Sequence, residues 1–159
     1  MSEQATIRTA TPDDLPELLH LWRHLEEHQG AYRMFPLVED AQQRAEAMFK
    51  ESIEDPNHRF FVAEQGGKLV AMLVAHRTES KGFSHAQTVD LSKLIVHNTH
   101  RNRTLGQRLV EAAEEFARET GATYLTARVF SDNLAGTGFW GALNFEPRYE
   151  ERARPVRKV

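Results

Sequence analysis

Apolar residues recur at helical spacing in three stretches of the chain, and a shorter fourth stretch follows near the end. The first predicts a helix that starts at Thr11 as N-cap, with Pro12 at its first position, and buries Leu15, Leu18, Leu19, Trp22 and Leu25. The second predicts a helix from about Asp40 to Asp55 that buries Ala41, Ala45, Met48, Phe49 and Ile53. The third predicts a helix that stops at Gly121 and buries Leu105, Leu109, Ala112, Ala113 and Phe116. A short helix is expected after Asn133.

Runs of strand-forming residues lie before and between these helices. They predict strands at 6–10, 60–63, 69–75, 87–96 and 123–130, with one or two more in 145–156. Residues 65–68 read Gln-Gly-Gly-Lys and predict the tight turn of a hairpin. The order β-α-α-β-β-β-α-β-α-β indicates a mixed α/β fold, and 159 residues suit a single domain over 1–159.

Composition excludes several classes of protein. A formal charge of -3 argues against a general nucleic-acid binder, which is usually basic. The absence of cysteine removes a thiol nucleophile, a disulfide and a cysteine-based metal site. No apolar run approaches membrane-spanning length and the first residues do not form a signal peptide, so we expect a cytoplasmic protein without a membrane partner.

The stretch from Val89 to Gly121 carries the clearest candidate chemistry. It reads as an apolar strand, a basic turn and the start of a helix, where unpaired N–H groups and the helix dipole favour a phosphate or pyrophosphate. Arg101, Arg103 and Arg108 are expected to cluster there. Gly106 is expected to let a ligand approach the backbone. The sequence therefore predicts a cradle for a phosphorylated cofactor.

Two motifs give this pattern a family resemblance. Arg101-Asn102-Arg103-Thr104-Leu105-Gly106 is similar to the Arg/Gln-x-x-Gly-x-Gly/Ala motif of the GCN5-related N-acetyltransferase (GNAT) superfamily. Asn133, Phe139-Trp140 and Asn144-Phe145 keep the spacing of a second GNAT signature. The resemblance implies a GNAT-like α/β fold, with a mixed central sheet, splayed central strands and flanking helices. It also implies acetyl-CoA as cosubstrate, with no metal.

The resemblance assigns roles to individual residues. Backbone amides around Ile95 and Val96 would meet the pantetheine arm and polarise the thioester carbonyl. Asp90 becomes the candidate general base, because the family's usual carboxylate positions hold Ser92 and Lys93 and Asp90 shares strand parity with Ser92. The coenzyme-binding residues implied are Leu94, Ile95, Val96, Arg101, Asn102, Arg103, Thr104, Leu105, Gly106, Gln107, Asn133 and Trp140.

Three positions depart from the family pattern. Thr104 replaces the first motif glycine and adds a branched side chain, whose hydroxyl can donate to a phosphate oxygen. Asn144 replaces a glycine, a mild change because asparagine tolerates a left-handed backbone. Trp140 replaces the tyrosine thought to protonate the leaving thiolate in many members, and an indole N–H is no acid at neutral pH. Core packing for Trp140 and helix capping for Asn133 are the alternative interpretations.

The resemblance implies an acyl-CoA-dependent N-acyltransferase that transfers acetyl to a primary amine of a small molecule or peptide. Residues 26–38 are the expected substrate-facing segment, and a homodimer is a family habit. The alternative is a catalytically silent acyl-CoA-binding protein, which the loss of the tyrosine permits.

A third interpretation follows from His24, Glu27 and His28, which match the H-x-x-E-H zinc-peptidase pattern. His20, His24 and His28 lie opposite the apolar stripe of their helix, so they are expected in solvent, without a third ligand or a pocket. The basic residues after Arg148 alternate with glutamates, which favours a solvated terminal strand over a nucleic-acid arm.

Overall fold

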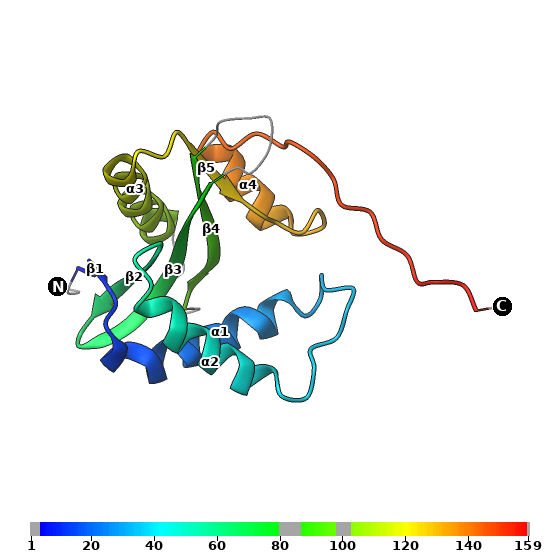
Figure 1. The fold of residues 1–159 in the computed structure, drawn as a ribbon, viewed down its shortest axis with the longest axis horizontal. Coiled ribbons are helices and arrows are strands. Elements are labelled where there is room, and N and C mark those ends of the chain that lie inside the picture. Colours follow the sequence, from blue (N-terminus) through cyan, green and yellow to red (C-terminus); the bar gives the residue numbers. More distant parts are fainter. Residues whose placement is uncertain (1–3, 80–86, 98–102, 159) are drawn as a thin grey trace.

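The computed structural model describes residues 4–79, 87–97 and 103–158, with the backbone alone at Arg103. Its elements follow the predicted order until the last helix (Figure 1). They are β1 (Thr6–Thr9), the 3-10 turn η1 (Pro12–Asp14), α1 (Leu15–Gln29), α2 (Ala41–Ile53), β2 (His58–Gln65), β3 (Lys68–Glu79), β4 (Gln87–Val96), α3 (Arg103–Thr120), β5 (Tyr124–Ala127) and α4 (Leu134–Ala142).

The described strands form a five-stranded sheet in the order β1-β2-β3-β4-β5. The first four strands pair antiparallel, and β5 joins β4 in parallel because α3 carries the chain back between them. At the β2–β3 turn Gly66 and Gly67 have φ of 58° and 76°, the left-handed backbone that a two-residue hairpin turn requires. Gly121 ends α3 with φ 76°, as the sequence predicted.

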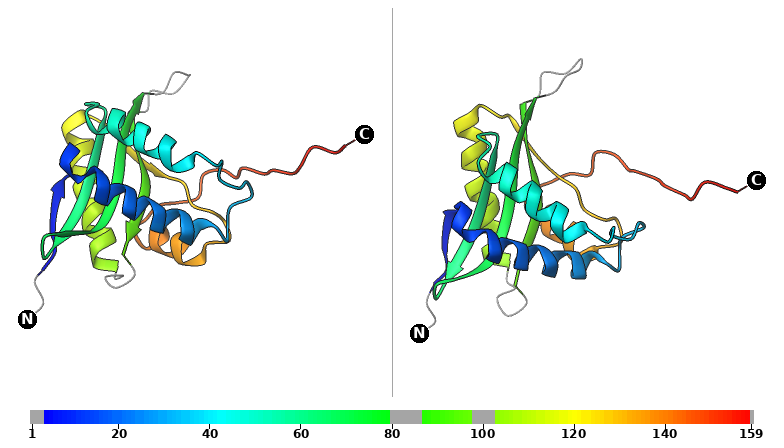
Figure 2. Two further views of the ribbon diagram at one scale, coloured as in Figure 1. Left: turned by 90° about the horizontal axis from the view of Figure 1, so that it is seen from below. Right: turned by 60° about the horizontal axis from the view of Figure 1, so that its bottom comes forward.

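Two hydrophobic clusters lie on opposite faces of this sheet. One joins α1 and α2 to the sheet around Leu18, Leu21, Phe49, Phe60 and Met72. The other joins α3 to the opposite face around Leu73, Leu91, Leu109, Ala113 and Phe116. Figure 2 shows α1 and α2 lying across the strands on one side, with α3 on the other. Strands β2 and β3 are therefore buried on both faces, and their residues read as continuous apolar runs.

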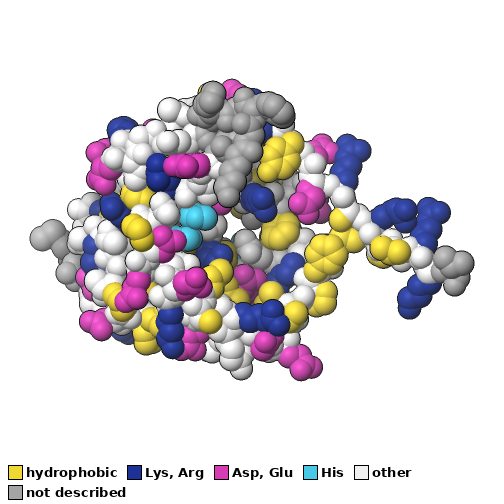
Figure 3. All heavy atoms as spheres, in the orientation of Figure 1, with side chains coloured by type: hydrophobic (Ala, Val, Ile, Leu, Met, Phe, Trp, Pro, Cys, Tyr) yellow, Lys and Arg dark blue, Asp and Glu magenta, His cyan; other side chains and the backbone are white. Residues whose placement is uncertain are grey.

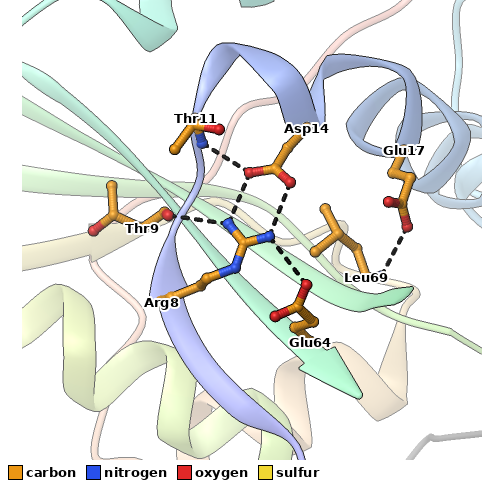
Figure 4. A network of polar contacts seen from close by, with 7 residues as sticks. All are labelled: Arg8, Thr9, Thr11, Asp14, Glu17, Glu64 and Leu69. Atoms are coloured by element: carbon orange, nitrogen blue, oxygen red, sulfur yellow. Dashed lines mark hydrogen bonds and ion pairs between the residues drawn. The ribbon is translucent and has the colours of Figure 1, made fainter. Parts of the chain in front are cut away.

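The start of α1 is fixed by ionic contacts (Figure 4). Arg8 on β1 donates to both carboxylate oxygens of Asp14 at 2.8 and 2.9 Å, and it lies 3.4 Å from a Glu64 oxygen. The backbone N–H of Thr11 donates to the same Asp14 carboxylate at 2.8 Å, which caps the turn η1. One turn on, a Glu17 oxygen accepts from the backbone N–H of Leu69 at 2.8 Å. These contacts tie the first helical turns to β1, β2 and β3.

Three predictions about elements were wrong in part. Met48 is 42% exposed instead of buried, and β5 stops at Ala127 rather than Phe130. Residues 146–158 form no strand; they extend away from the body and are exposed throughout (Figure 1). Pro147 and Pro155 lack N–H donors for a ladder, and the charges on both sides of this segment leave no apolar face to bury. Lys and Arg side chains gather along it, whereas both signs of charge mix over the body (Figure 3).

No helix within the described ranges combines the length and the apolar composition that a membrane crossing requires.

Candidate functional site

Strands β4 and β5 run side by side for only part of β4. Their pairing extends from Thr88 opposite Tyr124 to Leu91 opposite Ala127. Beyond Leu91, β4 continues to Val96 and pairs with β3 alone among the described strands. The edge of Ser92–Val96 that faces away from β3 thus presents backbone N–H and C=O groups to the opening. We call this opening, between Ser92–Val96 and the chain that follows Ala127, the strand fork.

A β-bulge lies on β4 at the fork. Ser92 opposes Val74 and Ile95 opposes Met72, so Lys93 and Leu94 share a single partner position on β3. The bulge changes which face each side chain joins. Leu91, Leu94 and Val96 pack with the α3 cluster, and Ile95 joins the α1/α2 cluster. Lys93 takes the left-handed φ of 52°, which is unusual for a long side chain.

Lys93 is a candidate functional residue that sequence reasoning missed. Burial lowers the pKa of its amine below the ordinary value, while the nearby charges of Glu26 and Asp90 partly oppose that shift. A lysine inside an apolar strand was the available signal, since a charged amine is seldom placed there without a partner. The alternation of residues along the sequence did not reveal the β-bulge that gives Lys93 this position.

Asp90 lies before the bulge, in the part of β4 that is paired with β5. Its carboxylate accepts a hydrogen bond from the Thr126 hydroxyl on β5 at 2.9 Å. Val89 and Leu91 pack with the α3 cluster, so strand alternation directs Asp90 to the α1/α2 face. The side chain is half-buried, and it is close enough to Lys93 to affect that amine.

The start of α3 follows the end of β4 after a short connection. Arg101 and Asn102 lie outside the described residues, and Arg103 begins the helix. Thr104 and Gln107 are exposed there, whereas Leu105 and Gly106 are buried. Arg108 does not join the helix start as expected: its guanidinium donates to the backbone carbonyl of Ala5 at 2.8 Å, because the helix turn directs it toward the N-terminal segment.

Gly106 has a packing role that the sequence did not reveal. A Cβ placed on it would lie 2.9 Å from a ring carbon of Phe139, closer than real Cβ contacts allow. The absence of a side chain therefore lets α4 approach α3 through the Phe139 ring. Close approach was predicted at this glycine, and the group that approaches in this structure is an aromatic ring.

Residues of the second motif hold α4 in place. The Asn133 side chain accepts from the backbone N–H of Gly136 at 3.0 Å, which confirms the alternative helix-cap interpretation. Trp140 packs edge-on against Phe139 and Phe145, with ring centroids 5.1 and 4.9 Å away. Asn144 has φ 67°, as expected for an asparagine in a glycine position. The motif therefore builds an aromatic group that packs α4 against the α3 cluster.

The segment after α1 reaches across to the chain beyond β5. Tyr32 stacks on Phe130 with ring centroids 6.3 Å apart. Arg33 donates to the Glu26 backbone carbonyl, and a second guanidinium nitrogen lies 3.6 Å from the Glu26 carboxylate. The surface is hollowed near its centre, in the area framed by α1, β4 and the segment after β5 (Figure 3). Apolar side chains are exposed on the segment that follows α1: Met34, Phe35, Leu37 and Val38.

The α1 histidines only partly follow their predicted placement. His20 and His28 are exposed, but His24 is half-buried and its ring lies against His97, just after β4, with centroids 4.9 Å apart. The His20 ring also lies against His24, with centroids 4.8 Å apart. His28 is outside this group, so the described residues do not bring the histidines and glutamate of the H-x-x-E-H pattern together as three metal ligands.

Comparison with known proteins places this geometry in context. Residues 18–145 match the profile of the Acetyltransferase (GNAT) family. An uncharacterized N-acetyltransferase of Methanocaldococcus jannaschii is 26% identical over 144 residues, which are 90% of this chain. The chain spans 61% of that relative's length.

Solved structures share the fold over nearly the whole chain. A tetramutant protein of Bacillus halodurans has a TM-score of 0.84 at 20% identity, covering 95% of this chain and 99% of that one. A predicted acetyltransferase of Clostridium acetobutylicum, solved with acetyl-CoA, has a TM-score of 0.80 at 11% identity, covering 95% and 96%. At such identities the likeness establishes the predicted mixed α/β fold and no more.

Proposed function

Because the chain belongs to the acetyltransferase (GNAT) family, we propose that it transfers an acetyl group from acetyl-CoA to a primary amine of a small molecule or a peptide. The observation that carries this proposal is the strand fork, where an edge of β4 that no described strand pairs with leads to the start of α3. An edge of free amides suits the amide-bearing pantetheine arm, and a helix start suits the pyrophosphate.

In this proposal acetyl-CoA enters the fork from the α3 side. Backbone amides of Leu94–Val96 bind the pantetheine arm and polarise the thioester carbonyl. The pyrophosphate binds the turn and first helical residues, Arg101–Gln107. Asn133 and Trp140 contribute through α4, since Asn133 caps that helix and Trp140 packs against Phe145 and the α3 cluster.

The acceptor amine approaches from the α1/α2 side, where Asp90 is directed. Asp90 takes a proton from the acceptor ammonium, whose pKa is roughly 10, and frees the nitrogen lone pair. The nitrogen attacks the thioester carbon and a C–N bond forms. The C–S bond then breaks to release the coenzyme A thiolate, and the nitrogen passes its second proton to that thiolate or to water. Lys93 is the competing proton acceptor, because its lowered pKa increases the neutral fraction of the amine.

Trp140 leaves the thiolate without the family's usual acid. Its indole N–H donates a hydrogen bond but no proton. A thiol with a reference pKa of about 8.5 leaves as a thiolate at moderate cost, so the transfer does not require that acid.

The acceptor side is bounded by the segment 26–38. The proposed lining of the acceptor site is the Tyr32–Phe130 stack, which joins this segment to the chain after β5, together with the exposed apolar side chains of Met34, Phe35, Leu37 and Val38. This lining supports an amine that carries an apolar group.

Two measurements test the proposal in sequence. Acetyl-CoA is expected to raise the melting temperature saturably, because a ligand that binds only the folded state stabilises it. Thiol release on an amine panel then tests turnover. Asp90→Asn is expected to lower kcat by about 10²-fold, the usual size of a general-base effect, with little change in acetyl-CoA affinity.

Lys93→Met and Asp90→Asn separate the two candidate proton acceptors, and Asp13→Asn is the control. Asp13 is an exposed acid outside the fork, so Asp13→Asn is expected to match the wild type. If Lys93→Met instead removes the acidic, rising limb of the pH–rate profile while Asp90→Asn retains it, Lys93 is the base. Absence of acetyl-CoA binding would overturn the whole proposal.

The packing of Trp140 favours one second candidate, a catalytically silent acyl-CoA-binding protein. This candidate shares the acetyl-CoA stabilisation but releases no thiol with any amine. The amine panel therefore decides between the two.

We also propose a cytoplasmic homodimer, on the family habit and on the open edge of β5. A hollow of about 340 Å³ lies beside that edge, between α3 and residues 142–145. The partner we propose for the β5 edge is a second copy of this chain, because an edge strand without a further partner among the described strands can pair with another chain. Light scattering after size exclusion tests it: a monomer at every protein concentration overturns the dimer.

A further inference from the structure

Three imidazoles from distant parts of the chain meet where α1 passes the end of β4. Each of His20, His24 and His97 offers a ring nitrogen, and these nitrogens all lie within 4.8 Å of one another. His20 and His24 are four residues apart on one helix, so they project from the same face. His97 follows β4, and its backbone N–H donates to the Val70 carbonyl on β3 at 2.8 Å. We call these three residues the imidazole cluster.

The spacing is close to that of a metal site. Imidazole nitrogens bind Zn²⁺ at about 2.0–2.1 Å in tetrahedral geometry, which places ligand nitrogens about 3.3 Å apart. Closing the present separation takes small side-chain rotations, and His20 is free of burial that would oppose them. The backbone that carries the other ligands is anchored, since Leu21 and Leu25 are buried on α1 and Ile95 is buried on β4.

We propose that the imidazole cluster binds one divalent transition-metal ion of the zinc class through His20, His24 and His97. Imidazole nitrogen suits zinc, nickel and copper ions, whereas calcium and magnesium prefer oxygen ligands. Three protein ligands leave a fourth position for water, and the exposure of His20 opens that position to solvent. This site departs from the metal-free protein expected from the sequence.

The bound ion joins two elements that bracket the fork. It links the middle of α1 to the residue after β4, next to the segment 26–38 and on the face to which Asp90 points. The ion therefore fixes α1 against the sheet at this end, as the Arg8–Asp14 pair does where the helix begins. The site itself does not depend on the proposed acetyl transfer.

The test uses the full chain without an affinity tag, freed of metal by a chelator. Calorimetry with Zn²⁺ is expected to show one equivalent bound, and Co²⁺ is expected to give the strong visible absorption of a tetrahedral site. His20→Ala removes an exposed ligand, so it retains the fold, and we expect at least a tenfold loss of Zn²⁺ affinity. His28→Ala is the matched control, an exposed histidine on the same helix outside the cluster.

The outcomes separate clearly. Stoichiometric binding that survives His28→Ala and weakens in His20→Ala and His97→Gln supports the site. Binding that is absent in the wild type, or equal in His20→Ala, overturns it, and the cluster is then a packing contact alone. Acetyl-CoA stabilisation is measured on the same samples, so failure of the metal site and failure of the acetyltransferase proposal are distinguished.

Discussion

The two faces of the sheet differ in how their chemistry is built. On the α3 face, close packing dominates: Gly106 admits the Phe139 ring, and Trp140 packs against Phe145. The α1/α2 face also has a hydrophobic cluster, but it carries ionisable groups as well, with Asp14 in an ion pair at one end of α1 and the imidazole cluster farther along. Strand β4 lies between them and serves both, because its bulge changes the face of successive side chains.

This difference indicates that the two faces of the sheet have different functional roles. The closely packed α3 face, with its backbone amides and helix start, suits a large cofactor of fixed structure. A face with amines, imidazoles and carboxylates suits proton transfer and a variable acceptor. If the roles divide in this way, changes on one face alter coenzyme A binding and changes on the other alter turnover or stability.

The largest loss of stability is expected from Asp14→Ala. It removes both Arg8 hydrogen bonds and the partner of the Thr11 N–H, and charged hydrogen bonds are worth about 1.5–3 kcal/mol. We expect a loss of about 2–3 kcal/mol in urea unfolding, with unchanged acetyl-CoA affinity. Asp13→Ala is the control, since Asp13 is an exposed acid in the same turn.

The Asp14 contribution is also expected to depend on pH. Hydrogen bonding to the Arg8 guanidinium holds the pKa of the Asp14 carboxyl below its usual value. Its stabilisation is therefore complete above the unfolded pKa of about 3.9 and is lost as pH falls through the lower folded pKa. The gap in unfolding free energy between wild type and Asp14→Asn is expected to shrink in acid; a constant gap contradicts the ion-pair account.

Gly106→Ala tests the close packing on the α3 face of the sheet. The added methyl meets the Phe139 ring at 2.9 Å, and overpacking of this kind costs about 1–3 kcal/mol. Thermal unfolding measures the loss, and acetyl-CoA affinity is expected to fall with it because the helix start moves. Gly138→Ala has nothing within 4 Å of its new Cβ, so it is expected to be neutral or stabilising. Equal effects of the two substitutions would remove the packing role of Gly106.

Lys93→Met tests the ionisable groups assigned to the α1/α2 face of the sheet. Burial lowers the pKa of the Lys93 amine, so between the folded and unfolded values the unfolded chain binds more protons and wild-type stability rises with pH. The methionine variant lacks that rise, so it is expected to be the more stable protein at neutral pH, with the difference shrinking as pH approaches about 10.4. Lys68→Met, at an exposed lysine, is expected to show no such pH dependence.

The smallest effect is expected from Thr104→Val, which removes one hydroxyl at the start of α3. If that hydroxyl donates to a phosphate oxygen, acetyl-CoA affinity falls about 3- to 10-fold, as for one hydrogen bond. Thr104→Ser is expected to retain the affinity. Unchanged binding by the valine variant would leave phosphate contacts to the backbone and the arginines.

Much of the fold was predictable because it rests on local patterns. The stripe from Leu15 to Leu25 and the Gln65–Lys68 turn determine a helix and a hairpin whatever lies around them. The predicted strand over 145–156 failed because its apolar residues are too few and a strand needs a partner edge, which a local pattern does not supply. The motif positions were predicted, but Arg101 and Asn102 lie outside the described residues, so their role remains a proposal.

The sequence by itself determined the order of elements, the GNAT motifs and the absence of cysteine chemistry, since each depends on residues close together in the chain. Tertiary structure decided which distant groups meet. It brought His97 to His20 and His24, placed Phe139 over Gly106, and put the half-buried Lys93 at a bulge. The spacing of residues along a helix or strand determines which face each side chain lies on. Only the packing of one element against another determines which side chains of distant segments meet, and the candidate site is made of such side chains.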